Sequence, residues 1–341
     1  MTQVPFADVD WLLNRVSGAH WLFIGCVGPE KRSISCLSRV NGRLNSRHLL
    51  RIFDQKIPSG LELNILDQRK SEAIELGVPS ENISDQFLFA TNDHISAFCK
   101  NSISHGGNVI LDITSLPKRW FFFLLRELLT KFNLKNLIIT YSSASGYAAD
   151  LSFDPEFARA LPGFQLLTPR SNSDIAFVGV GYHAAGLRSV LEQQTPKQIQ
   201  MFFPFPPGLP GMMRNWDSVR NLEQISREIL IDQFSVSGER LTYLQLHAHD
   251  VGLCFEAMVK LTDSGKKTSM GAPYGPKPLS LAMCLFALAC EAAGLPEVPL
   301  YYTQPTRYSF EYSTDVKLVN GIAEVTAFPV VLAGRNQYVI G

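Results

Sequence analysis

Short apolar runs alternate along the first half of the chain with longer stretches that favour helix. The runs at 21–25, 108–112 and 137–141 are short and almost wholly apolar, which predicts strands buried on both faces. Between and after them, 92–100 and the strongly apolar 119–132 predict helices. Buried strands that alternate with helices of about ten residues indicate a parallel sheet with helices on both faces. The first half of the chain therefore predicts an α/β lobe.

Four further segments complete the elements expected in this lobe. Residues 6–16 have apolar positions near helical spacing and predict a leading helix, and 33–40 predicts the helix after the first strand. Residues 61–66 alternate apolar and polar, which predicts a second strand, and 71–76 predicts a helix.

The second half follows a stretch rich in proline and glycine, 154–173, which predicts a linker. Segment 202–211 contains four prolines, and it cannot be helical because each proline fixes its own φ and removes a donor. We expect an ordered loop there. The other predicted elements are a helix at 221–232, a strand at 242–246, and strands with a turn at Asn320-Gly321 over 316–340.

The two halves of the chain repeat a pattern. An apolar run leads through Gly25 to Arg32 in the first half, and a similar run leads through Gly181 to Arg188 in the second, each over seven residues. Pro117-Lys118 and Pro276-Lys277 then each open an apolar run. The offsets are 156 for the arginines and 159 for the lysines, a drift that loop insertions would cause. We infer an ancient duplication, with one lobe over 1–155 and the other over 170–341.

Composition and charge narrow the class of protein. A 341-residue chain with 46% apolar and 18% charged residues suits two compact domains rather than a disordered chain. The 31 basic and 31 acidic residues leave no formal net charge, so no overall field would draw the protein to duplex nucleic acid or an anionic membrane. A small anionic ligand needs only a local pocket and stays open.

Cysteine usage and apolar segments indicate the compartment. The six cysteines form no CxxC pair and several lie in apolar runs, which is typical of free thiols in a reducing cytoplasm. The first residues lack the basic start and apolar stretch of a signal peptide. The longest apolar segment, 279–293, is shorter than the roughly 20 residues that span a bilayer. We expect a soluble, cytoplasmic protein with no membrane partner.

The segment from Thr114 to Lys118 carries the clearest candidate chemistry. Hydroxyls at a strand end, followed by proline in the first turn of a helix, place backbone N–H groups, a positive helix end and a cation around one point. That arrangement suits a phosphate. The alternative is that Ser115 caps the helix and Lys118 is solvated. The equivalent Gly275-Pro276-Lys277 in the second half favours the phosphate.

Arg32 and Arg188 follow glycine-bearing loops after the first strand of each lobe. Arginine suits planar, bidentate recognition of phosphate or carboxylate. A structural ion pair, for instance of Arg32 with Glu30 or Asp67, is an equal alternative. The glycine spacing matches neither a dinucleotide nor a Walker fingerprint, so no nicotinamide or ATP cofactor is expected.

Histidines and tyrosines supply the other candidates. His247 and His249 share a strand face, so they could hold a metal together with a nearby carboxylate, or one could act as a general base, but no third metal ligand is evident and we expect no metal site. His183 is better placed for ligand contact than for catalysis. Tyrosines at or after the last strand of each lobe could stack on a base or belong to the core; they are Tyr141, Tyr147, Tyr301, Tyr302 and Tyr308.

The phrase Asp112-Ile113-Thr114-Ser115-Leu116-Pro117-Lys118, between a strand and a long helix, resembles the CARF-type Rossmann-like domains, and the doubled layout resembles the SAVED domains. The resemblance implies a sensor of cyclic or linear oligonucleotide messengers in prokaryotic antiviral defence, with the ligand held between lobes by strand-end loops. No fused effector domain is visible, so the resemblance implies a separate effector protein. The residues on which it falls are Thr114, Ser115, Lys118, Gly275, Lys277, Arg32 and Arg188.

We therefore expect an α/β protein of two pseudo-equivalent Rossmann-like lobes, each a mostly parallel sheet flanked by helices, that binds a nucleotide-type ligand between the lobes. One alternative is an enzyme that hydrolyses a phosphodiester or glycosidic bond, with His247, His249, Asp250, His183 and Glu30 as candidate acids and bases. Another is a protein-interaction scaffold using segment 202–210. The expected ligand-binding residues are Gly25, Glu30, Arg32, Ser33, Asp112, Thr114, Ser115, Lys118, Tyr141, Gly181, His183, Arg188, Ser189, Tyr274, Gly275, Lys277 and Tyr301.

Overall fold

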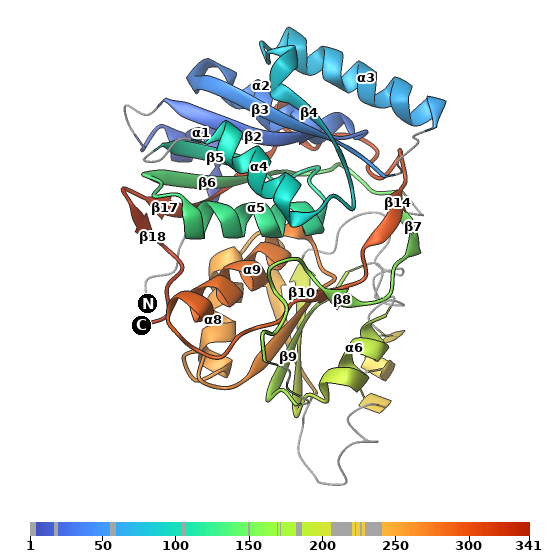
Figure 1. Ribbon diagram of the computed structural model, residues 1–341, viewed down its shortest axis with the longest axis vertical. Coiled ribbons are helices and arrows are strands. Elements are labelled where there is room, and N and C mark those ends of the chain that lie inside the picture. Colours follow the sequence, from blue (N-terminus) through green and yellow to red (C-terminus); the bar gives the residue numbers. More distant parts are fainter. Residues whose placement is uncertain are drawn as a thin grey trace. The chain divides into compact units, whose positions relative to one another are not determined.

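The computed structural model divides the chain into two compact units (Figure 1). The first unit comprises Pro5–Asp154 and Pro305–Gln337, and the second comprises Pro155–Gln304 and Tyr338–Gly341. The residues that the structure describes are 5–16, 20–54, 59–103, 107–148, 151–168, 170, 172–181, 186–205, 220–221, 223–225, 227–228 and 241–341.

The first unit is built on a mixed sheet in the order β1-β17-β6-β5-β2-β3-β4, with β18 paired to β17. The run from β6 to β4 is parallel, while β17 joins β6 and β1 joins β17 antiparallel. The strands are β1 (Ala7–Asp8), β2 (Trp21–Val27), β3 (Leu44–Phe53), β4 (Ile83–Phe87), β5 (Asn108–Asp112), β6 (Asn136–Ser142), β17 (Val325–Leu332) and β18 (Arg335–Asn336).

Helices cover both faces of this sheet (Figure 1). Apolar residues of α1 (Val9–Leu13), α2 (Ser35–Val40) and α3 (Gly60–Glu75) share a core cluster with β2. On the other face, α4 (Asn92–Ser102) packs beside α5 (Lys118–Lys131). Trp120 and its three phenylalanine neighbours in α5 are buried. These apolar residues are the reason that the sequence predicted the helix clearly.

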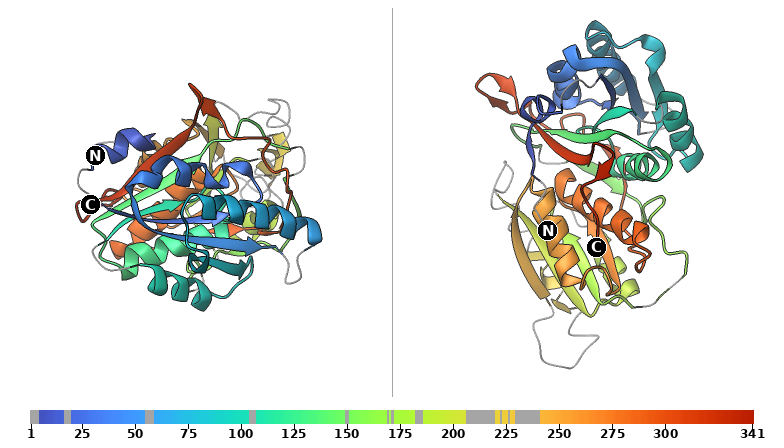
Figure 2. Two further views of the ribbon diagram at one scale, coloured as in Figure 1. Left: turned by 90° about the horizontal axis from the view of Figure 1, so that it is seen from above. Right: turned by 90° about the vertical axis from the view of Figure 1, so that its left-hand side faces the viewer.

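The second unit has a parallel sheet in the order β11-β10-β9-β12. Helices α8 and α9 lie side by side against it, as the right-hand view of Figure 2 shows. The elements are β8 (Arg159–Ala160), β9 (Ile175–Gly179), α6 (Leu187–Gln194), β10 (Gln198–Phe205), β11 (Leu241–His247), α8 (Val251–Leu261), β12 (Ser269–Pro273), α9 (Lys277–Ala292) and β13 (Tyr301–Tyr302).

The two units share one strand order. In chain order the first four parallel strands of each unit lie third, second, first, fourth across the sheet, as β4-β3-β2-β5 and as β11-β10-β9-β12. Helices α5 and α9 each follow the fourth strand, and each begins at a lysine whose preceding proline is the N-cap. The prediction of two Rossmann-like lobes with mostly parallel sheets is confirmed.

The end of the chain departs from the predicted lobe boundaries. Pro305–Gln337 belongs to the first unit, although we expected 170–341 to form the second lobe. The reason is pairing: β17 adds to β6 in the first sheet, and β14 (Pro305–Tyr308) pairs with β7 (Ser152–Pro155). The hairpin of β15 (Leu318–Val319) and β16 (Ile322–Ala323) turns at Asn320-Gly321, both with positive φ, as the sequence predicted.

Several element predictions were wrong. Residues 61–66 lie in helix α3, whose first turn is capped by the Ser59 hydroxyl accepting from the Glu62 N–H. The expected leading helix at 6–16 is a short strand, β1, and the short helix α1. Residues 202–205 belong to β10 rather than to a loop, and 206–211 lie outside the described residues. Strands β3 and β4 were not predicted.

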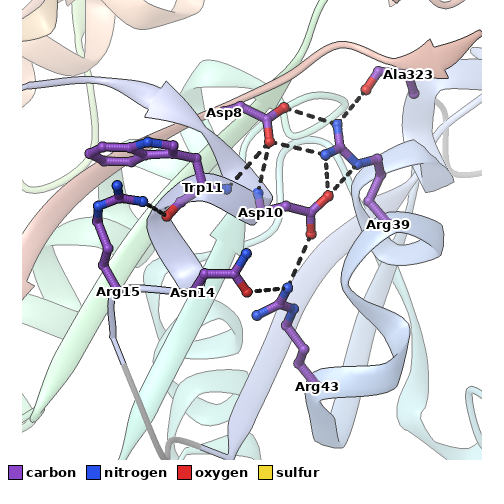
Figure 3. A network of polar contacts seen from close by, with 8 residues as sticks. All are labelled: Asp8, Asp10, Trp11, Asn14, Arg15, Arg39, Arg43 and Ala323. Carbon is purple, nitrogen blue, oxygen red and sulfur yellow. Dashed lines mark hydrogen bonds and ion pairs between the residues drawn. The ribbon is translucent and has the colours of Figure 1, made fainter. Parts of the chain in front are cut away.

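A network of charged side chains joins three distant parts of the first unit (Figure 3). Arg39 of α2 pairs with Asp8 and Asp10 at the start of the chain and donates to the carbonyl of Ala323 in β16 at 2.8 Å. Arg43 reaches Asp10 at 3.5 Å. Both segments are therefore fastened to the same helix.

None of the helices among the described residues has the length and hydropathy needed to cross a membrane. All six cysteines are buried free thiols.

Candidate functional site

The first unit has a topological switch point at β2. This strand lies between β5 and β3, so the chain leaves β2 towards one side and later returns on the other. In open α/β sheets, ligands bind at such a point, beyond the carboxyl ends of the strands. Here the loops after β2 and β5 touch, because a Cβ at Gly28 would lie 2.7 Å from the Cβ of Ser115. Glycine at position 28 is what permits this approach.

Two of the predicted residues build the loop after β5. The carboxylate of Asp112 accepts hydrogen bonds from the N–H and hydroxyl of Thr114 at 3.2 and 2.5 Å, and from the hydroxyl of Thr140 at 3.3 Å. The Thr114 hydroxyl oxygen accepts from the N–H of Ser142 at 2.8 Å. Asp112 and Thr114 are both buried. They fix the loop to β6, and so hold the following residues in place.

Ser115 differs from these neighbours. Its hydroxyl is buried and has no hydrogen-bond partner among the described residues. It does not cap the helix, because the N-cap of α5 is Pro117 and no side chain caps that end. Lys118 is the first residue of α5 and is buried rather than solvated. The alternative in which Ser115 caps the helix and Lys118 faces solvent is therefore wrong.

A buried clamp holds the loop after β2. Arg32 is only 1% exposed and forms an ion pair with Glu30. It also donates to the Tyr141 hydroxyl at 3.0 Å and to the Ser142 carbonyl at 2.9 Å. Burial alone would lower the pKa of Arg32, but Glu30 and the neighbouring tyrosines outweigh burial and raise that pKa above its usual value.

This clamp engages residues for which ligand contact was predicted. The Arg32 guanidinium donates a hydrogen bond to the Glu30 carboxylate, which accepts a further hydrogen bond from the Ser313 hydroxyl at 2.9 Å. The other proposed partner of Arg32, Asp67, is paired with Arg51 instead. Tyr141 is buried, and its hydroxyl bonds that of Tyr147 at 3.0 Å. Its ring is therefore core rather than a stacking surface.

Two smaller residues of the first unit that were predicted to contact the ligand have other protein groups as close neighbours. Gly25 lies inside β2, where an added Cβ would come within 2.8 Å of the Phe23 ring, so it is not at the strand end. The Ser33 hydroxyl donates to the Gly28 carbonyl at 3.2 Å and helps to shape the loop.

At the switch point of the second unit, the loops after β9 and β12 approach each other through backbone atoms. A Cβ at Gly181 would lie 2.0 Å from the carbonyl oxygen of Tyr274, and one at Gly179 would lie 3.1 Å from the nitrogen of Gly275. Lys277 opens α9 directly after this contact. The Tyr274 hydroxyl accepts from Thr303 at 3.4 Å, and burial raises the pKa of Tyr274 to about 12.

Other predicted residues of the second unit lie on its surface or edge. Arg188, in α6, is half exposed and pairs with Glu192 and Glu228, each at 2.9 Å. Its surroundings therefore do not match those of Arg32. Ser189 is exposed on the same helix, and Tyr301 is half-buried in β13. His183 lies outside the described residues.

The histidine cluster does not form a metal site in the part of the chain that is described. No group of three potential ligands was found among those residues. The N–H of His249 donates to Nδ1 of His247 at 3.2 Å. Asp250 caps α8 by accepting from the N–H of Leu253 at 2.8 Å. The cluster ends a strand and starts a helix.

One carboxylate at the first sheet was missed from the sequence. Asp54 directly follows β3, and its Oδ2 accepts from the N–H of Tyr308 at 2.6 Å. Burial raises the pKa of Asp54 to about 6; the Tyr308 N–H opposes this shift and the nearby Glu62 carboxylate adds to it. The apolar run that ends at Phe53 was the available signal, since an acid after such a run lies at a strand end.

No protein-family model matches the chain, and no curated protein is similar to it in sequence. Similar solved structures include a protein of unknown function from Pseudomonas aeruginosa PAO1 and a candidate universal stress protein from Pseudomonas aeruginosa UCBPP-PA14. Both are 11% identical over 86% of this chain, covering 95% and 96% of their own, with a TM-score of 0.23. That TM-score is too low to support a functional argument.

Proposed function

We propose that this chain is a binding module for a phosphate-bearing, nucleotide-type ligand, held at the switch point of the first unit. The observation that carries the proposal is the buried hydroxyl of Ser115, which lies between Gly28 and the first turn of α5 and has no hydrogen-bond partner in the described part of the chain. A ligand oxygen would give that hydroxyl a hydrogen-bond partner, and buried polar groups normally have one. The helix N-terminus and the Lys118 ammonium would favour an anion there.

The second unit supports the proposal by its equivalent construction. Lys277 opens α9 after Pro276, as Lys118 opens α5 after Pro117. The resemblance to CARF and SAVED domains extends the proposal to a sensor of oligonucleotide messengers in antiviral defence, whose ligand-bound form acts on a separate effector protein.

Ligand-dependent stabilisation of the fold tests the proposal. Purified protein would be titrated with nucleoside mono- and triphosphates and with cyclic di-, tri- and tetranucleotides, with melting followed by scanning fluorimetry. A ligand at about 100 times its Kd should stabilise the fold by about 2.7 kcal/mol. The variant Lys118→Met should lose this shift.

The matched control is Lys100→Met, which removes an exposed lysine from the same unit. It should keep the shift. A shift that persists in Lys118→Met would contradict the proposal. Conversion of a probe into product, detected by mass spectrometry, would favour the hydrolase alternative over a binding module.

A further inference from the structure

The pairing pattern of the β15–β16 hairpin shows which of its backbone groups point outward. Val319 lies opposite Ile322 on either side of the two-residue turn, and Leu318 lies opposite Ala323. In antiparallel strands such pairs alternate, so that one pair exchanges hydrogen bonds and the next directs its N–H and C=O groups away from the partner strand. The pair beside a two-residue turn is the bonded one. The backbone groups of Leu318 and Ala323 therefore point out of the hairpin.

Two contacts agree with this alternation. The N–H of Glu324 donates to the carbonyl of Lys317 at 2.8 Å, as expected of the next bonded pair. The carbonyl of Ala323 accepts from Nη1 of Arg39 in α2 at 2.8 Å, outside the hairpin (Figure 3). The outer edge of β16 is therefore occupied. Among the described residues no hydrogen bond to the outward groups of Leu318 is found, so the edge of β15 is the open one.

The open edge of β15 has none of the features that usually prevent strands from associating. Folded proteins protect free edges with charged residues, prolines or bulges. Residues 318–323 contain no charged residue and no proline. Leu318, Val319 and Ile322 are 56%, 48% and 55% exposed. The flanking Lys317 and Glu324 pair with each other at 3.0 Å. This edge is therefore suited to pairing with another strand.

We propose that the open edge of β15 pairs with β15 of a second copy of this chain, antiparallel, about a two-fold axis at Leu318. The two Leu318 residues exchange their outward hydrogen bonds, and the two hairpins join into one continuous sheet. Arg39 occupies the edge of β16, so each hairpin offers one edge. The pairing therefore closes as a two-fold dimer instead of extending into a filament.

Charge and size fit a weak dimer of this kind. In this register Lys317 of each copy lies opposite Val319 of the other, and Asp315 lies opposite Gly321, so no two like charges face each other. Two-residue strands bury far less than the roughly 1,200 Å² of total surface that stable complexes bury. We therefore expect a reversible dimer whose population depends on protein concentration.

Sedimentation velocity tests the inference on the full chain. Wild-type protein should pass from monomer to dimer between about 1 µM and about 1 mM, the range of weak complexes. Leu318→Pro removes the outward N–H, which the hairpin itself does not use, so this variant should keep the wild-type melting temperature and stay monomeric. Leu318→Ala keeps that N–H and is the matched control, which should still dimerise.

Two opposite charges at position 319 test the register. Val319→Lys places a lysine opposite Lys317 of the other copy, twice by symmetry, whereas Val319→Glu places a carboxylate there. The dimer of the glutamate variant should be about tenfold tighter than that of the lysine variant. Leu61, an exposed apolar residue of α3, provides the matched pair Leu61→Lys and Leu61→Glu, and both should dimerise like the wild type.

Three results would overturn the inference. If the wild-type protein stays monomeric at the highest concentration, the edge of β15 pairs with a strand of a different protein or with none. A dimer that forms equally well in Leu318→Pro and in the wild type uses another surface. Equal dimerisation of Val319→Lys and Val319→Glu would exclude the register centred on Leu318.

Discussion

The loops after β2 and β5 meet through a serine side chain, whereas the loops after β9 and β12 meet through backbone atoms. Gly28 faces Ser115 in the first unit, and Gly181 faces the Tyr274 carbonyl in the second. Strand order and the Pro-Lys helix start are the same in both units. The two units therefore share a scaffold but differ in the groups that meet at their switch points, so the contacts of a residue in one unit do not give those of its counterpart.

The two arginines that follow the first strands show the same divergence. Arg32 is buried and holds Glu30, Tyr141 and the Ser142 carbonyl, whereas Arg188 is half exposed and pairs with glutamates on the helix surface. Their matched positions in the sequence suggested one role for both. The structure gives Arg32 the role of a clamp within the first unit.

The largest expected effect is a difference in stability between variants of these two arginines. Arg32→Met should lower the free energy of unfolding by about 3–5 kcal/mol, because it leaves the Glu30 carboxylate buried and unpaired. Arg188→Met should change it by less than about 0.5 kcal/mol, since exposed ion pairs contribute little. Urea denaturation measures both. Similar losses for the two variants would show that the arginines are equivalent after all.

Local patterns in the sequence were enough for much of the fold. β2, β5 and β6 are apolar along most of their length, and α5 carries a strong apolar stretch, so each was predicted close to its observed bounds. β3 was missed because Arg51 interrupts its apolar run, and only the structure shows that Asp67 and Asp85 balance that charge. Only three residues of helix α3 are buried, namely Glu62, Leu66 and Ala73, so its sequence lacks the apolar stripe of a packed helix.

Local sequence likewise predicted some residues of the candidate site and missed others. Ser115 and Lys118 follow a strand directly in the sequence, so their place at the sheet edge could be predicted. Asp54 could not be found without β3. Arg188 pairs with Glu192 one turn along its helix and also with Glu228, which is 40 residues away, and no local pattern encodes the second contact.

The next effect tests the two close approaches directly. Gly181→Ala should cost about 3 kcal/mol, because the new methyl group meets a carbonyl oxygen that belongs to the backbone. Gly28→Ala should cost about 1–2 kcal/mol and should be partly rescued by Ser115→Gly, which removes the opposing Cβ. A double-mutant cycle measures the rescue. No coupling between positions 28 and 115 would contradict the contact.

A smaller effect appears as a dependence on pH. The pKa of Asp54 is about 6 in the folded protein against an ordinary value of 3.8, so the folded state holds this proton more tightly than the unfolded chain. Its contribution to stability is present in full below pH 4 and is lost as pH rises through 6. Asp54→Asn should therefore become more stable relative to wild type, by about 2 kcal/mol, between pH 4 and 7. Parallel pH profiles for the two proteins would refute the raised pKa.

The smallest effect compares a serine from each switch point. The hydroxyl of Ser280, in the first turn of α9, lies within hydrogen-bond distance of the carbonyls of Pro273, Gly275 and Pro276, at 3.1 to 3.3 Å. Ser280→Ala should cost about 1 kcal/mol. Ser115→Ala should leave stability unchanged within about 0.5 kcal/mol, because its hydroxyl makes no bond to the described residues that could be lost. The same variant should weaken nucleotide binding. Unaltered stability together with reduced affinity would indicate that the hydroxyl binds a ligand. If Ser115→Ala instead destabilises the fold as much as Ser280→Ala, the hydroxyl already has a structural partner and the two switch points differ less than their contacts indicate.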